Sequence, residues 1–502
     1  MAAVEETHQK RTYGNWRKPV SAGILGLGTA GTVLLFAGLI VVIITVMLTN
    51  LLYAVVVAAV LGAVVLAVST RDVHGRNALD KIIAGAGWRM GRSRGSHLYR
   101  SGPLGRTPWG TCQLPGIAAG TRLSEFEDSY GRPCAMVYSP TGQTYATVIA
   151  TEPDGASLVD EPQIDQWVAD WGHWLANLAD EPGIEGVSVT VETAPDFGAR
   201  LRREVQGNID PEAPVFAQEM LREVVQAYPE GSSTVKAYVT LTFSSAARVG
   251  GKRRKEDEMA RELAARLPNL TRDLQATGAG AAQPVSAQEL CEVIRTAYDP
   301  RAAILFDEAA VKGEVMELEW TEVGPAAAEA TWDGYRHENA YSVTWEMSQP
   351  PRGHVQAHIL TRLLAPHNDV ARKRVTMLYR PIDSARAAGI VEADMRSAEF
   401  RMSATEKPSA RDVMAYRAAQ ATANEEAAGA GLVQFGMLVT ATVEDLDMAR
   451  DAAATIENLG AAARLRLRRV YGSQDSAFAA ALPLGLIPSK HLSAPQEMMT
   501  KL

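Results

Sequence analysis

The feature that most constrains this 502-residue chain is a run from Pro19 to Thr70 that contains no charged residue. Thr49-Asn50 divides the run into two apolar stretches, Ile24–Leu48 and Leu51–Val68. A helix needs about 20 apolar residues to cross the hydrocarbon core of a bilayer. A charged side chain at the bilayer centre costs about 3 kcal/mol or more, so charges are expected to be missing there. The run therefore predicts a two-helix transmembrane hairpin over residues 24–68.

Basic residues flank this run on both sides, while the turn at its centre has no charge. They are Lys10, Arg11, Arg17 and Lys18 before it, and Arg71, Arg76, Lys81, Arg89, Arg92 and Arg94 after it. Positive residues favour the cytoplasmic side of a membrane. The pattern predicts a two-pass protein of the plasma membrane with both termini and the large soluble region in the cytoplasm. A signal peptide fits less well, because its apolar core is only about 7–15 residues long. The alternative is a buried helical pair in a soluble core.

The charge balance is acidic, with a formal net charge of −8, although the segment that follows the hairpin is basic. An acidic distal region argues against a general nucleic-acid coat. The basic segment is suited to anionic lipid, with about 1 kcal/mol for each Lys or Arg near the surface. The three cysteines, Cys112, Cys134 and Cys291, form no CxxC pair and no metal-binding spacing, which fits a reducing compartment.

The rest of the chain predicts an α+β fold with two ferredoxin-like, split βαβ regions. In the first region, expected strands at 144–151, 184–193 and 236–244 alternate with helices at 160–180, 213–228, 256–274 and 286–298. In the second, expected strands at 340–347, 374–379, 432–443 and 463–468 are separated by helices at 354–364, 409–428 and 443–458. Residues 77–132 are rich in Gly and Pro and predict an irregular arm.

These expectations divide the chain into six parts. They are a cytoplasmic tail (1–23), the transmembrane hairpin (24–68), a basic juxtamembrane arm (69–135), a first α/β region (136–312), a second α/β region (325–490) and a tail (491–502). The boundary between the two α/β regions is expected near Gly313–Gly324.

Motifs that would indicate an enzyme are missing. A phosphate-binding loop needs GxxxxGK[ST], in which backbone amides and the lysine hold the phosphates. The nearest text, Gly250-Gly251-Lys252, lacks the upstream glycine and the Ser or Thr. No GxSxG elbow or Ser/Cys nucleophile context stands out. His354 and His358 lie four residues apart, but no HExxH accompanies them, and His337, Glu338 and His367 add no recognisable metal pattern. We expect no catalytic residue, no cofactor and no metal.

One basic cluster is a candidate contact for a partner or a phosphate group. It consists of Arg248, Lys252, Arg253, Arg254 and Lys255, and acidic residues 256–258 follow directly. The partner would be DNA or an acidic protein surface. The simpler interpretation is a solvated loop that leads into a helix, whose N-terminus favours the acids. No aromatic residue interleaves the basic ones, as single-strand binding would require.

Two further patterns have plain structural interpretations. Trp167, Trp171 and Trp174 recur at helical spacing, which favours a core-facing stripe over a docking stripe. Arg372, Lys373 and Arg374 precede a strand and predict an exposed sheet edge, where charge blocks unwanted pairing.

Several long segments resemble a membrane protein family encoded on integrative and conjugative elements of actinobacteria. They are RTYGNWRKP (Arg11–Pro19), YRSGPLGR (Tyr99–Arg106), VTVETAPDFGARLRREV (Val189–Val205), LLAPHNDVARKRVTMLYRP (Leu363–Pro381) and YGSQDSAFAAALPLGL (Tyr471–Leu486). That family is similar to the N-terminal, non-ATPase region of the conjugation ATPase of type IV secretion systems. In the ATPase a sequence motif like AFAAALPLG immediately precedes the nucleotide domain, whereas here only residues 486–502 follow this motif.

The resemblance implies a non-enzymatic, membrane-anchored scaffold of a conjugative type IV secretion system. It would dock a separately encoded ATPase and contact the lipid bilayer, other membrane components of the system and further copies of itself; direct contact with DNA stays open. One alternative is the membrane component of a type VII secretion system with a cytosolic domain. Another is a membrane-tethered enzyme with a non-standard site, against which the missing motifs argue.

Overall fold

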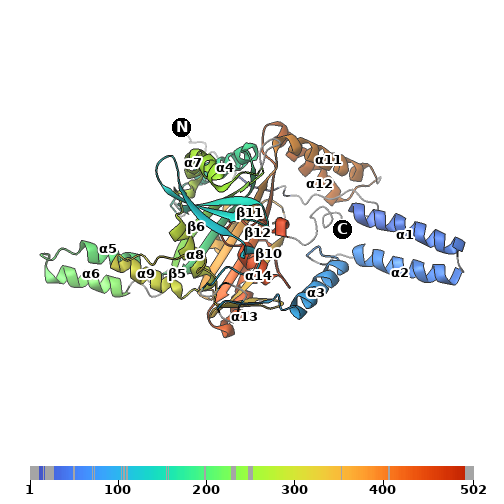
Figure 1. The fold of residues 1–502 in the computed structure, drawn as a ribbon. Coiled ribbons are helices and arrows are strands. Elements are labelled where there is room, and N and C mark those ends of the chain that lie inside the picture. The colour runs from blue at the N-terminus through green and yellow to red at the C-terminus, as the bar shows by residue number, and fades with distance from the viewer. Residues whose placement is uncertain are drawn as a thin grey trace, which may run out of the picture.

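A single large antiparallel sheet organises the protein in the computed structural model (Figure 1). The structure describes residues 11–14, 16, 28–48, 51–69, 72, 74–102, 105, 108, 111–153, 155, 158–196, 199–227, 233–246, 253–351, 353–404 and 407–491. The sheet has 13 strands in the order β1-β8-β9-β10-β12-β11-β5-β6-β4-β3-β2, and β13 and β7 pair with β10 and β4 outside this path. The chain therefore has the predicted α+β composition, but its strands share one sheet.

The first half of the sheet is built from residues 122–284. Its strands are β2 (Arg122–Glu127), β3 (Pro133–Ser139), β4 (Thr144–Glu152), β5 (Ile184–Pro195), β6 (Ser233–Ser244) and β7 (Ala281–Pro284). Helix α4 (Glu161–Asp180) connects β4 to β5, and α7 (Glu256–Leu274) connects β6 to β7. The spatial order β7-β4-β6-β5 with these two crossovers is the split βαβ arrangement.

The second half repeats this plan. Its strands are β8 (Ala327–Ala330), β9 (Tyr335–His337), β10 (Ala340–Gln349), β11 (Arg372–Pro381), β12 (Val433–Val443) and β13 (Arg466–Arg469). Helix α10 (Thr361–Leu364) lies between β10 and β11, and α13 (Ala449–Ala462) between β12 and β13. The order β13-β10-β12-β11 matches that of the first half, and the hairpins β2–β3 and β8–β9 occupy equivalent edges.

The two halves meet where β5 pairs with β11 in antiparallel register. At the centre of this pair, Thr190 lies opposite Thr376, and their hydroxyls are 3.2 Å apart. Equivalent strands of the two halves therefore face each other across an approximate two-fold axis. The predicted boundary near Gly313–Gly324 falls between α9 (Ala302–Lys312) and β8, yet the hydrogen-bonded sheet is continuous across both regions.

The two faces of the sheet have different covers. Helices α4 and α7 pack on one face of the first half, and α10 and α13 pack on the same face of the second half. The opposite face is covered by α8 (Ala287–Tyr298) and by α14 (Gln474–Ala480) with the segment that follows it. The alternation of side chains along each strand sends Val187 and Val189 to the first face and Thr190 and Glu192 to the second.

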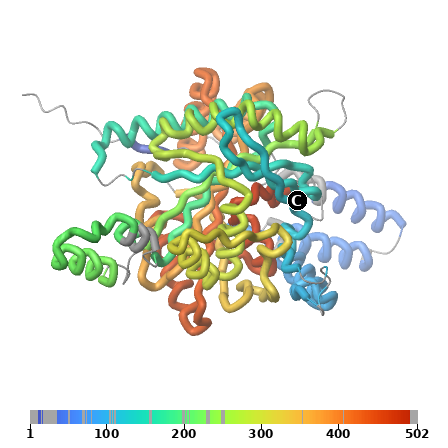
Figure 2. The backbone as a smooth tube through the Cα atoms, turned by 60° about the vertical axis from the view of Figure 1, so that its left-hand side comes forward, coloured from blue at the N-terminus to red at the C-terminus, as the bar shows by residue number. Residues whose placement is uncertain are grey.

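Each half also carries an inserted helical pair, between β5 and β6 in the first half and between β11 and β12 in the second. In the first half the pair is α5 (Ala199–Asn208) and α6 (Val215–Ala227), and in the second it is α11 (Ser384–Ser403) and α12 (Ala410–Ala427). The two pairs project from opposite sides of the sheet in Figure 1, and the α5–α6 arm stands clear of the body in Figure 2 as well. The sequence predicted α6 and α12 but missed their partners.

The charge-free run folds into α1 (Gly28–Leu48) and α2 (Leu51–Ser69), which lie side by side (Figure 1). The predicted transmembrane hairpin is nevertheless contradicted: within the described residues, no helix combines the length and hydropathy required to cross a membrane. The two-pass plasma-membrane location rested on that hairpin and is withdrawn with it. α1 has 21 residues and α2 has 19, so both helices are close to the roughly 20 apolar residues that a span requires.

The segment predicted to be an irregular arm is partly ordered into regular elements. Helix α3 (Ala78–Ser93) and strand β1 (Leu98–Arg100) lie in it, and β1 pairs with β8 at one end of the sheet. Three glycines inside this helix, at 85, 87 and 91, obscured its periodicity in the sequence.

Candidate functional site

The predicted basic cluster lies where β6 leads into α7. Arg248 and Lys252 are outside the described residues, and the side chains of Arg253 and Lys255 are exposed. The backbone amide of Lys255 donates to the Glu258 carboxylate at 3.1 Å, and the acids 256–258 form the first turn of α7, as the helix dipole favours. The described part of the cluster therefore forms the start of a helix.

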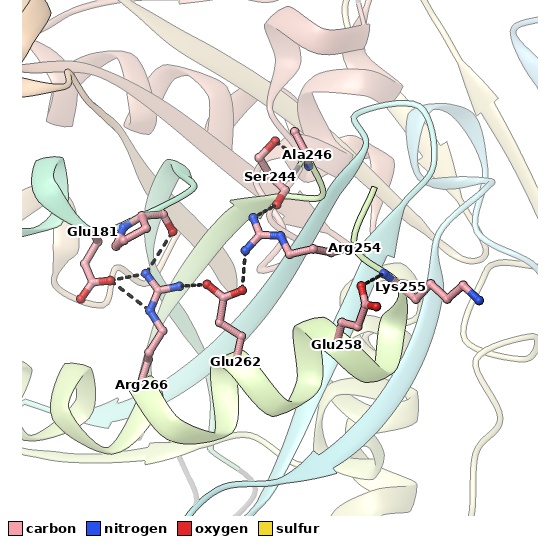
Figure 3. A network of polar contacts seen from close by, with 9 residues as sticks. Glu181, Ser244, Ala246, Arg254, Lys255, Glu258, Glu262 and Arg266 are labelled. Carbon is pink, nitrogen blue, oxygen red and sulfur yellow. Dashed lines mark hydrogen bonds and ion pairs between the residues drawn. The ribbon is translucent and has the colours of Figure 1, made fainter. Parts of the chain in front are cut away.

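Arg254 belongs to a chain of ion pairs rather than to a free basic surface (Figure 3). It pairs with Glu262 and donates to the Ser244 carbonyl at 2.7 Å. Glu262 also accepts from Arg266 at 2.8 Å, and Arg266 pairs in turn with Glu181 at the end of α4. The chain fastens α7 to the end of β6 and to the α4–β5 turn. Arg254 thus has a structural role, and of the cluster members that the structure describes, Arg253 and Lys255 are exposed.

The three consecutive basic residues at the start of β11 are buried, which contradicts the prediction of an exposed edge. β11 lies between β12 and β5 at the centre of the sheet. Arg374 donates twice to the Glu192 carboxylate, at 2.8 and 3.0 Å, and Arg372 pairs with the other oxygen of the same carboxylate. Lys373 points to the opposite face, where its ammonium donates to the Ala365 carbonyl at 2.5 Å. Arg372 and Arg374 thus neutralise Glu192 of β5, and they do not lie on an exposed sheet edge.

The electrostatics of this cluster follow from its burial. Burial opposes ionisation of Glu192, but the guanidinium groups of Arg374 and Arg372 outweigh it and lower the pKa of Glu192 to about 2. Burial lowers the pKa of Lys373 to about 8. Arg372 Nε and Arg374 Nη1 have no hydrogen-bond partner among the described residues. The Glu192 carboxylate is thus paired with two buried guanidinium groups.

The histidines singled out in the sequence are not brought together. Among the residues that the structure describes, no cluster of His, Cys, Asp and Glu side chains is arranged to hold a metal ion. His337 is buried between the Tyr298 carbonyl and the Ser342 hydroxyl, and burial lowers its pKa to about 4. His354 precedes the helical turn at Ala357–Leu360 that contains His358, so the two do not share a helix face. His337 is thus a neutral core residue.

The tryptophan stripe of α4 packs inward, as predicted. Trp174 is buried, and Trp171 stacks on it with ring centroids 5.0 Å apart. Trp171 also packs edge-on against Tyr379 of β11 at 5.8 Å. The stripe therefore attaches α4 to the junction between the two halves of the sheet.

A cleft that the sequence did not predict opens beside the edge strand β13. Its volume is about 800 Å³, and its walls come from residues 72–84, from α13, and from β13 with the neighbouring aromatic side chains of Trp332, Trp345 and Tyr471. Basic groups dominate its lining: Arg76, Lys81, Arg466, Arg468 and Arg469, against Asp72 and Glu457. A signal was present in the sequence, since Arg464, Arg466 and Arg468 alternate along the strand predicted at 463–468 and Arg469 follows directly.

Comparison with protein families gives one finding. Residues 20–80 match a family model described as a domain of unknown function (DUF8461). The match covers the hairpin α1–α2 and the start of α3, and it includes Asp72, His74 and Arg76 of the β13 cleft. A comparison with curated proteins gives no match.

Proposed function

We propose that this protein is a non-enzymatic scaffold of a conjugative, type IV secretion apparatus and docks a separately encoded ATPase. The observation that carries the proposal is the position of the segments that carry the family resemblance. Three of them, Val189–Val205, Leu363–Pro381 and Tyr471–Leu486, meet in the interior of the sheet and supply contacts at its centre.

Three of these segments converge at one buried point. Glu192 comes from the segment 189–205, Arg374 from 363–381, and Phe478 from 471–486. Arg374 binds Glu192 and lies over the Phe478 ring, with its guanidinium carbon 5.6 Å from the ring centroid. The Thr376 hydroxyl donates to the Ala481 carbonyl at 2.8 Å. These contacts hold the two halves of the sheet and α14 together, which supports a structural rather than a catalytic role for the three segments.

A docking surface for the ATPase is available on the α5–α6 arm. Helix α6 is amphipathic and has no buried residue among those described. Val215, Phe216 and Met220 are 68%, 76% and 57% exposed, whereas apolar side chains of this size are normally covered in a folded protein. The arm projects well away from the sheet (Figure 2), so a partner can approach it without contacting the core. We assign the conjugation ATPase of the same element as its occupant.

The experiment is co-purification of the full chain with that ATPase, in parallel with mating assays. Phe216→Ser combined with Met220→Ser should weaken the complex at least about tenfold, the loss expected when hot-spot side chains are removed. Phe400 on α11 is likewise exposed, at 72%, and Phe400→Ser is the matched control that should leave the complex intact. Deleting the gene should abolish conjugative transfer without slowing growth.

Two outcomes would count against the proposal. A normal transfer frequency in the deletion strain would remove the conjugative role. Equal retention of the ATPase by the α6 variant and the control would exclude the arm as the docking surface. If the α6 variant instead changed the protein from an oligomer to a smaller species in solution, the arm would be an interface between copies of this chain.

A further inference from the structure

Two rows of side chains run along one face of α6 in the α5–α6 arm. Phe216, Met220 and Val224 recur at every fourth position and form an apolar row, in which Val224 is 45% exposed. Glu219 and Glu223 form an acidic row beside it, because residues three and four apart are neighbours on a helix surface. Together these five residues form the α6 face, which is apolar along one side and negatively charged along the other.

The α6 face points away from the rest of the protein. Helix α5 contacts α6 and also α9, which attaches the arm to the body. The partly covered side chains of α6, Gln218 and Val225, lie on the opposite side of the helix from the two rows. In Figure 1 the arm extends to the left of the sheet, with no element beside it except α9. The described residues therefore leave the α6 face uncovered.

The acidic row has no counter-charge in the described part of the chain. Glu219 and Glu223 are exposed, and neither carboxylate takes part in an ion pair or a hydrogen bond there. The one basic residue of α6, Arg222, donates to the Gln218 side chain at 3.2 Å. Both carboxylates are therefore available to cations that a partner brings.

We infer that the α6 face binds a basic amphipathic helix of the ATPase. The apolar row would pack against the apolar face of that helix, and Lys or Arg on its flank would lie opposite Glu219 and Glu223. Paired helices combine these two elements, because apolar rows bury surface while flanking charge pairs select the partner and its orientation. The inference rests on the proposed function, which places the ATPase on this arm, and it adds the chemistry of the docking element.

The acidic row distinguishes between partners. An acidic helix would place like charges opposite each other, and a nucleic acid would be repelled in the same way. From Phe216 to Val224 the apolar row covers about 12 Å along the helix axis, at about 1.5 Å per residue. A partner helix of about three turns is therefore long enough to cover the α6 face.

The test is titration of the full chain, without the ATPase, with two fluorescent helical peptides of about 18 residues. The peptides share one leucine face and differ only in the flanking residues, which are lysine in one and glutamate in the other. The lysine peptide should bind at least about 4-fold more tightly, because two exposed charge pairs attract in one complex and repel in the other. At about 0.5 M salt the two affinities should converge, since exposed charges are screened.

Charge reversal separates a specific contact from a general effect of net charge. Glu219→Lys combined with Glu223→Lys should reverse the preference, so that the glutamate peptide binds more tightly. A misfolded variant would lose both peptides and would not exchange one for the other. The matched control is Glu392→Lys combined with Glu399→Lys, which reverses two exposed glutamates on α11 of the other helical pair. This control changes the net charge equally and should keep the preference for lysine.

Removal of the apolar row should have a different effect. Phe216→Ser combined with Met220→Ser should weaken both peptides at least about tenfold, because both rely on the same apolar contact. The peptide titration and the co-purification can fail separately. A chain that selects the lysine peptide but retains no ATPase contradicts the proposed function alone. An ATPase retained by a chain without a preference for lysine contradicts this inference alone.

Four results would overturn the inference. They are equal affinity for the two peptides at about 50 mM salt, no binding of the lysine peptide at about 100 μM protein, loss of the lysine preference in the α11 control, and dissociation of an oligomer of the chain by the α6 charge reversal. The third would reduce the preference to net charge, and the fourth would make a second copy of the chain the occupant of the α6 face.

Discussion

Replacing Glu192 with glutamine tests whether one buried carboxylate holds the centre of the sheet together. The substitution keeps the shape of the side chain but removes the only carboxylate that pairs with Arg372 and Arg374 among the described residues. Those arginine side chains are 8% and 3% exposed, so two cations would remain buried without a counter-charge. Breaking a buried ion pair in this way costs about 3–5 kcal/mol.

The pKa of Glu192 gives a second estimate of the same quantity. A pKa lowered from 4.5 to about 2 corresponds to about 3 kcal/mol, at about 1.4 kcal/mol per pKa unit. Because the folded-state pKa is the lower one, this stabilisation is fully present above about pH 4.5. It is lost as the pH falls from there toward 2. The difference in unfolding free energy between wild type and Glu192→Gln should therefore shrink across that window.

Urea unfolding followed by tryptophan fluorescence measures both effects. At pH 7 the midpoint for Glu192→Gln should fall without a change in m-value. A triple variant, Glu192→Leu with Arg372→Met and Arg374→Met, should recover most of the stability, because apolar groups of similar volume often replace buried ion pairs without loss. A Glu192→Gln protein within 1 kcal/mol of wild type at pH 7, or a difference that does not change between pH 5 and pH 2.5, would refute the reasoning.

Two further substitutions probe the α7 ion chain and the C-terminal segment by the same unfolding measurement. Arg266→Gln should destabilise the fold by about 1–3 kcal/mol, because it removes the charged partner of the half-buried Glu181 carboxylate, whereas exposed Arg253→Gln should stay within about 0.5 kcal/mol. Equal effects of the two substitutions would mean that the ion pairs of α7 do not stabilise the fold. Gly485→Ala should cost about 2 kcal/mol or more, since Gly485 has φ +65° and an added Cβ would lie 2.3 Å from the Ala146 side chain; a stable Gly485→Ala protein would show that this segment shifts freely.

Sequence alone predicted the alternating strands and amphipathic helices well. β4, β5, β6, β10 and β12 were each expected within a few residues of their observed bounds, because period-2 alternation over apolar positions is a local signal. The capping box of α8 was also legible, and Ser286 does accept from the Glu289 amide at 3.2 Å.

What the sequence could not supply depends on partners far apart in the chain. Arg374 looked exposed because its counter-charge, Glu192, lies on a strand 182 positions earlier. The β13 cleft was missed for the same reason, since residues 72–84, Trp332, Trp345 and Tyr471 meet only in the fold. The hairpin prediction relied on the missing charge, which by itself does not establish that a helix spans a bilayer.

The repeated strand order gives the central pair β5–β11 the geometry of an isologous dimer interface inside a single polypeptide. In a dimer of identical halves, the same edge strand would meet itself across the two-fold axis, as Thr190 meets Thr376 here. A dimer of identical chains would make every contact across the axis twice, once on each side of it. Here Glu192 faces Arg374 on one side of the axis, whereas Ser188 faces Leu378 at the equivalent place on the other side. Because both halves belong to one polypeptide, the two sides of the junction can differ, and the ion pair is made only once.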